Sequence, residues 1–144
     1  MRTRSAILLL VIAALCFGGC DVNFNGYAKD HPKEDWDHYD YVFEGPSPAT
    51  EGLDELIKFN LDDEDRVTGE VMGIFYSKAT GTLNGDTLEL TMSSFVDNQC
   101  IDPGNATFVG QIADGKLIGH FTVWSCIWYE FDFEGELAGG RVLE

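Results

Sequence analysis

The chain has 144 residues, a length typical of one domain, and its 44% hydrophobic and 24% charged residues indicate a globular rather than a disordered protein. With 9 Lys and Arg against 25 Asp and Glu, the formal net charge is −16. This acidity argues against nucleic-acid binding, which requires a basic surface, and against electrostatic attachment to anionic lipid headgroups.

The first 19 residues predict an export signal. Arg2 and Arg4 form a cationic start, residues 6–17 (AILLLVIAALCF) form an unbroken apolar run, and Gly18 and Gly19 supply the small residues that a signal peptidase requires. The apolar run is shorter than the roughly 20 residues needed to span a bilayer. We therefore expect a cleaved leader and not a transmembrane helix.

The sequence FGGC at residues 17–20 resembles the lipobox of bacterial lipoprotein precursors, in which a small residue precedes a Cys that is diacylated on its sulfur and becomes the mature N-terminus. The resemblance implies lipid attachment at Cys20. It does not fit Cys16, which follows the bulky Leu15. An ordinary secretory signal cut nearby is the alternative.

Acyl chains on Cys20 would supply the membrane attachment that the acidic surface cannot, at about 0.8 kcal/mol per buried CH₂. The expected location is the cell envelope, with the domain facing the periplasm or the cell exterior. Asp21 resembles the inner-membrane retention signal of enterobacterial lipoproteins.

Residues 20–37 predict an acidic flexible tether, because they show neither a helical nor a strand period and contain Gly26 and Pro32. Trp36 is the side chain that could pack the end of this tether on the domain. The domain itself is expected over residues 38–144, with a loop at residues 44–52 (EGPSPATEG).

The domain is predicted to be all-β. Strands are expected at residues 38–44, 54–61 and 66–76, followed by two hairpins over residues 80–95 and 106–124. Asn84-Gly85 and Asp114-Gly115 are typical of type I′ hairpin turns. The last strand alternates apolar residues, beginning at Tyr129, with acidic residues, beginning at Glu130.

These patterns indicate an antiparallel meander of about eight strands. Closure into a small β-barrel, complete or nearly so, removes the exposed edge strands of such a meander. A two-sheet β-sandwich is the alternative.

Cys100 and Cys126 are predicted to form a disulfide, because an exported domain with two cysteines folds in an oxidising compartment. The meander supports this pairing, since it places the connections that carry the two residues at the same end. A free thiol is the alternative. The sequence contains no C-x-x-C motif to suggest zinc or redox chemistry.

Two acidic segments contain residues that could bind a metal ion. The first carries His31 and His38 among Asp30, Glu34, Asp35, Asp37 and Asp40, but it lies in the expected tether and is interpreted as solvated. The second, residues 62–65, lacks the spacing of an EF-hand loop and is interpreted as a hairpin tip. We expect no metal site and no cofactor.

The sequence shows no recognisable catalytic arrangement, and we expect the protein not to be an enzyme. His120 falls on an exposed strand face without an evident acidic partner, and Ser125 sits at the expected disulfide corner outside any G-x-S-x-G motif. Glu130 and Asp132 lie two residues apart on an exposed face, as solubility alone would produce.

Trp124 and Trp128 flank Cys126 and are the candidate partner-binding residues. They could instead cap the barrel or pack on the tether. Small periplasmic inhibitor lipoproteins, such as the membrane-bound lysozyme inhibitors, are similar in gross plan, although their sequence motifs are not found here. The resemblance implies a binding or inhibitor module, and the acidity suits a basic protein partner.

The alternative function is a lipocalin-like carrier of a small apolar ligand. The two functions differ in whether the phenylalanines expected inside, at positions 108, 121, 131 and 133, fill the interior or line a cavity. The oligomeric state stays open.

Overall fold

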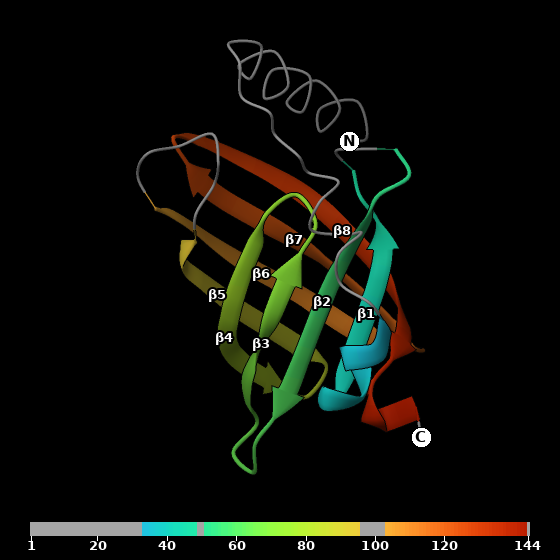
Figure 1. Ribbon diagram of the computed structural model, residues 1–144. Helices are drawn as coiled ribbons and strands as arrows, with labels where there is room; N and C mark the ends of the chain where they lie inside the picture. The colour runs from blue at the N-terminus through green and yellow to red at the C-terminus, as the bar shows by residue number, and fades with distance from the viewer. Residues whose placement is uncertain (1–32, 49–50, 96–102, 144) are drawn as a thin grey trace.

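The computed structural model describes residues 33–48, 51–95 and 103–143 (Figure 1). Its elements, in chain order, are the 3-10 helix η1 (Lys33–His38), β1 (Tyr41–Pro46), β2 (Asp54–Leu61), β3 (Arg66–Met72), β4 (Tyr76–Asn84), β5 (Thr87–Phe95), β6 (Gly104–Ala113), β7 (Lys116–Ser125), β8 (Ile127–Gly139) and the 3-10 helix η2 (Arg141–Leu143).

The eight strands form a closed antiparallel barrel in meander order. Each strand pairs with the next, and β8 closes the barrel on β1, where Phe43 pairs with Leu137 and Glu44 with Glu136. The all-β meander and its closure are therefore confirmed, and the two-sheet sandwich is excluded. Closure pairs the first strand with the last and so reduces the length of strand edge open to pairing with another chain.

The third predicted strand is shorter than expected. Residues 66–76 do not form one strand, because β3 ends at Met72 and a turn at residues 73–75 leads into β4. Gly73 has φ 151°, and the next two residues, Ile74 and Phe75, are buried in the main hydrophobic cluster. Burial of these two apolar side chains favours the turn over a continued strand.

The two predicted hairpin turns differ in detail. Asp114 and Gly115 both have positive φ (53° and 72°), as the predicted type I′ turn requires. The other turn is shifted by one residue from the prediction. Asn84 ends β4 and pairs with Thr87, so the loop is Gly85 and Asp86, and of these Gly85 has positive φ (60°).

The interior is packed with aromatic rings. Phe108, Phe121, Phe131 and Phe133 are at most 2% exposed. The ring centroid of Phe121 lies 4.6 Å from those of Phe108 and Phe131, and Phe133 meets Phe108 and Phe121 edge-on. In the described part of the barrel these four rings fill the space between the strands and contact one another.

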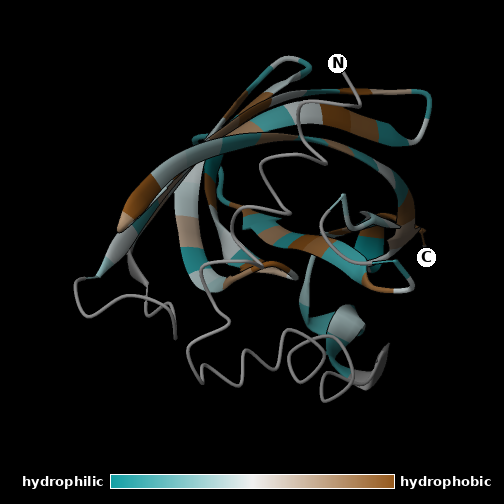
Figure 2. Ribbon diagram, turned by 90° about the horizontal axis from the view of Figure 1, so that it is seen from above, coloured by the Kyte–Doolittle hydropathy of each residue, from teal (hydrophilic) through white to brown (hydrophobic). Residues whose placement is uncertain are grey.

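The outer wall follows the predicted alternation. Along β8, Tyr129, Phe131 and Phe133 are buried, whereas the acidic residues between them are exposed. The same alternation appears as bands of contrasting hydropathy along the strands in Figure 2.

One threonine from each of β3 to β7 lies in a single row across the outer wall. Thr68 pairs with Thr80, Thr80 with Thr91, Thr91 with Thr107, and Thr107 with Thr122. Cross-strand pairs of this kind stabilise a sheet by about 0.2–1 kcal/mol each. The row therefore stabilises the pairing of five neighbouring strands.

The packed part of the chain begins before residue 38. η1 lies against the outer face of the barrel (Figure 1), and Trp36 is 8% exposed. Trp36 packs with Val42, Leu56 and Met72 in a second, smaller hydrophobic cluster. The end of the segment expected to be a tether is thus part of the folded domain, and the rest of that segment lies outside the described residues.

Candidate functional site

Two tryptophans lie opposite each other where β7 turns into β8. Trp124 pairs in register with Trp128, and Cys126, with φ 58°, stands at the tip of the turn between them. Trp124 is 55% exposed and Trp128 is 56% exposed. This end of the barrel is opposite the β2–β3 turn, which is at the bottom of Figure 1. More than half of the surface of each tryptophan is therefore available for contact with another molecule.

The same outer wall carries further exposed apolar side chains, nearer the other end of β6 and β7. Val109 of β6 is 52% exposed and Ile118 of β7 is 55% exposed. The register pairs Val109 with His120 and Gln111 with Ile118, so both apolar residues are set among polar neighbours. We call the outward-facing residues of β6 to β8 the tryptophan face.

Four acidic residues follow Trp128 along the outside of β8. Glu130, Asp132, Glu134 and Glu136 are exposed and stand at every second position, about 6.6 Å apart by strand geometry. Lys116 of β7 lies 3.8 Å from Glu134. The row ends at an open hollow between β1 and β8, which is lined by Glu44, Gly45, Pro46, Asp54, Lys116, Glu134 and Glu136. The tryptophan face is therefore strongly negative on its β8 side.

His120 lies within this acidic row and has the acidic partners that the sequence did not reveal. Its Nδ1 atom lies 2.8 Å from Asp132 Oδ1, and its Nε2 atom lies 3.6 Å from Glu130 Oε1. All three side chains are about half exposed or more. The register brings them together across β7 and β8, where His120 is paired with Asp132.

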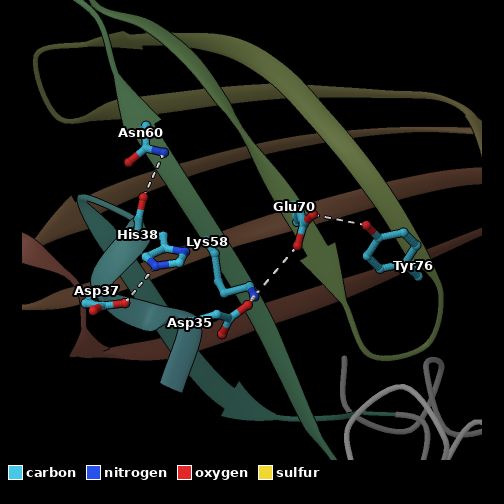
Figure 3. Close-up of polar contacts among 7 residues, drawn as sticks. All are labelled: Asp35, Asp37, His38, Lys58, Asn60, Glu70 and Tyr76. Carbon is cyan, nitrogen blue, oxygen red and sulfur yellow. Dashed lines mark hydrogen bonds and ion pairs between the residues drawn. The ribbon is translucent and has the colours of Figure 1, made fainter. Parts of the chain in front are cut away.

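A second group of polar side chains fixes η1 to the barrel wall (Figure 3). The ammonium group of Lys58 lies 2.9 Å from Asp35 Oδ2 and 3.7 Å from Glu70 Oε2. It also lies 4.7 Å from the centre of the Tyr39 ring. The Lys58 side chain is fully shielded from solvent, so the two carboxylates and the ring replace the water that it loses.

Two tyrosine hydroxyls complete this Lys58 cluster. The Tyr76 hydroxyl donates to Glu70 Oε1 at 3.0 Å. Burial, followed by the neighbouring charge of Glu70, raises the pKa of Tyr39, and the same two causes together with that hydrogen bond raise the pKa of Tyr76. Both phenols therefore stay neutral at physiological pH. The cluster has the contacts of a structural clamp, in which the Lys58–Asp35 ion pair joins η1 to the barrel wall and Glu70 holds the lysine from the wall side.

Two further carboxylates of the first acidic segment, those of Asp37 and Asp40, also contact neighbouring groups of the protein. Asp37 lies 3.5 Å from His38 Nε2, and Asp40 lies 2.9 Å from Arg141 Nη2 and accepts from the backbone N–H of Leu61.

In the second acidic segment, Asp62 caps the β2–β3 turn, where it accepts from the backbone N–H groups of Glu64 and Arg66. These hydrogen bonds, that of Arg66 foremost, lower the pKa of Asp62. Within residues 33–48, 51–95 and 103–143, no group of three or more His, Cys, Asp or Glu is arranged to hold a metal ion.

Glu55 is the second buried charged residue that sequence reasoning missed. Its position on β2 shares the inward side with Ile57 and Phe59, and it is 1% exposed. Its Oε1 atom accepts from the backbone N–H of Ile74 at 2.8 Å and from the Ser47 hydroxyl at 3.1 Å. Both Lys58 and Glu55 occur in the short stretch DELIKFNL, where a charged residue in an otherwise apolar strand is the available signal.

The cysteine predictions fall largely on residues that the structure does not describe. Cys20, with the leader and Asp21, lies outside the described residues, and so does Cys100. Cys126 stands at the β7–β8 turn, at the same end of the barrel as the last residue of β5, Phe95, and the first residue of β6, Gly104. Among the described residues, no helix is long and apolar enough to cross a bilayer.

Comparison of the chain with family models, with curated proteins and with solved structures finds no match.

Proposed function

We propose that this protein is a lipid-anchored envelope protein whose barrel binds a basic protein partner through the tryptophan face. The observation that supports the binding role is the pair Trp124 and Trp128, both more than half exposed on a rigid two-strand corner. Tryptophan is enriched among the residues that contribute most to protein–protein binding. Strand residues hold such side chains in place before binding, which lowers the entropy cost of association.

Charge complementarity supports a basic partner. The acidic residues of β8 extend from Trp128 to the hollow beside β1, and the whole chain carries a net charge of −16. A surface of one sign attracts a partner of the opposite sign and speeds their encounter. The tryptophans would then supply contact area, while the carboxylates orient the partner.

The packed interior favours this role over the carriage of an apolar ligand. The four phenylalanines contact one another and are almost fully buried. In the described interior their ring surfaces are therefore covered by other side chains and do not line a ligand cavity. Because the features that stand out among the described residues are an exposed tryptophan pair and an acidic row, we propose binding or inhibition and not catalysis.

In this proposal the protein is anchored by a lipid on Cys20, because FGGC resembles a lipobox. Asp21 would retain it in the inner membrane. The disulfide between Cys100 and Cys126 would stabilise the tryptophan corner, since Cys126 lies between the two indoles in sequence. Growth of cells with labelled palmitate tests the anchor: label is expected in the wild-type protein and lost in Cys20→Ala.

The binding role is tested by capture of envelope and secreted proteins on the immobilised full chain. A basic protein, for which lysozyme is a convenient probe, is expected to bind the wild type and to lose binding to the Trp124→Ala/Trp128→Ala variant. A matched control is Val142→Ala/Leu143→Ala, which removes two exposed apolar side chains from η2. Equal binding by all three proteins would contradict the proposed face.

A further inference from the structure

The turn between β3 and β4 closes part of one end of the barrel with its own side chains. Ile74 and Phe75 of this turn are buried within the main hydrophobic cluster. The ring of Phe75 meets that of Phe121 edge-on, with centroids 6.1 Å apart. We call residues 73–75 the plug, because they fold into the barrel end and not away from it.

Glu55 holds the plug in place. Its Oε1 atom accepts hydrogen bonds from the Ile74 backbone N–H and from Ser47, which follows β1. Gly73 packs so closely on the carboxyl group that a Cβ at this position would overlap it. One side chain of β2 therefore joins the plug to the connection between β1 and β2.

The surroundings of Glu55 favour a neutral carboxylic acid. Its second oxygen, Oε2, is buried and has no hydrogen-bond partner in the described residues. A buried carboxylate with an unpaired oxygen is costly, and protonation lowers that cost by removing the charge. Burial raises the pKa of Glu55 to about 8, although the hydrogen bonds from Ile74 and Ser47 act in the opposite direction.

The charges around Glu55 reinforce this preference. Among the described residues, Asp54 is the charged side chain whose field acts on Glu55, and its negative charge further raises the pKa. The groups packed against the carboxyl from the other elements, namely Ser47, Gly73 and Ile74, carry no charge. No described cation is therefore placed to stabilise the ionised form.

We propose that Glu55 is a proton-dependent latch, whose neutral form holds the plug in the barrel end and whose ionisation releases it. Release of the plug carries Glu55 into water, where its pKa returns to the ordinary value of 4.5. The equilibrium constant for opening therefore rises by about tenfold per pH unit between pH 4.5 and 8, and levels off above pH 8. Opening would expose to water the part of the aromatic interior beside Phe121, which the ring of Phe75 contacts in the closed form.

Hydrogen exchange of the plug in the full-length chain tests the latch. The rates of the segment 72–76 are measured from pH 5.5 to 8.5 and divided by those of an unstructured peptide of the same sequence. The wild-type protection factor is expected to fall by up to about tenfold per pH unit. In Glu55→Gln the protection is expected to stay constant, because the amide keeps an acceptor for Ile74 and does not ionise.

Glu89→Gln is the matched control, because Glu89 is an exposed carboxylate on β5 and its variant is expected to follow the wild type. Constant protection in the wild type, or an equal pH-dependent loss in Glu55→Gln, would overturn the latch. Carbon-13 NMR of the Glu55 carboxyl group gives a second test that needs no variant. A titration near pH 8 supports the latch, and a titration near pH 4.5 contradicts it.

Discussion

Lys58 Nζ lies 2.9 Å from Asp35 Oδ2, and this ion pair joins η1 to the barrel across 23 positions of sequence. The lysine side chain is fully shielded from solvent, whereas the side chain of Asp35 is 37% exposed. Together with the packing of Trp36 on Val42, Leu56 and Met72, the pair makes η1 a part of the domain. Fragments meant to fold should therefore begin before residue 33.

Asp35→Ala is expected to lower the free energy of unfolding by about 2 kcal/mol. The substitution leaves a buried ammonium group whose remaining carboxylate, Glu70, lies 3.7 Å away. The partial exposure of Asp35 keeps the loss below the 3–5 kcal/mol typical of a fully buried pair. Urea unfolding of the full chain measures it. Asp37→Ala, an exposed position on the same helix, should change stability by less than about 0.5 kcal/mol, and equal losses at both positions would contradict the clamp.

Phe121→Ala is expected to destabilise the barrel by about 3–5 kcal/mol, because it removes a ring in contact with Phe108 and Phe131 at the centre of the core. Ile118→Ala, at an exposed position three residues earlier on the same strand, should change stability by about 0.5 kcal/mol or less. Urea unfolding compares the two variants. A loss below about 1 kcal/mol for Phe121→Ala would indicate that its ring borders open space and would favour a carrier.

The stability of wild type and Glu55→Gln should diverge with pH. The pKa of Glu55 is about 8 in the folded protein and 4.5 as the ordinary value. Below pH 4.5 the residue is neutral in both states, so it adds no pH dependence. Between pH 4.5 and 8 the unfolded chain releases the proton that the folded chain retains, so the wild type loses up to about 1.4 kcal/mol per pH unit relative to the variant. Denaturation at pH 5, 6.5 and 8 measures this difference, and parallel curves would contradict it.

Cys100→Ser and Cys126→Ser are each expected to cost about 3 kcal/mol, because either substitution removes the cross-link that closes a loop of about 25 residues. The double variant should be no less stable than the single variants, since all three lack the same bond. Thermal unfolding measures the losses, and thiol labelling located by peptide mapping shows whether Cys100 and Cys126 react in the wild type. Labelling of both residues in the folded wild type, or additive losses, would contradict the disulfide.

The fold could be predicted from the sequence because its signals are local. Alternation along the last strand and the Gly-containing turns, such as Asp114-Gly115, indicate a meander, and a meander of eight strands has closure as its simplest way to remove edges. The threonine row from Thr68 to Thr122 could not be predicted, because it depends on the register of five strands. The plug could not be predicted either, since GIFY reads equally well as the end of a strand.

The candidate site could be predicted in part. The outward direction of Trp124 and Trp128 follows from their strand alternation, whereas their exposure depends on whether another segment covers them. Lys58 shows the opposite case, because alternation places it outside and η1, distant in sequence, then covers it. The partners of His120 likewise depend on the register between β7 and β8.

Oxidative footprinting of the three tryptophans in the full chain tests the central claim most directly, because Trp36 provides a buried reference within the same protein. In the purified protein, Trp124 and Trp128 are expected to react with a small water-soluble oxidant and Trp36 to be protected. In intact envelopes that contain the partner, Trp124 and Trp128 are expected to become protected as well. Reactivity of Trp124 and Trp128 in envelopes equal to that in the purified protein would contradict the tryptophan face as a docking site.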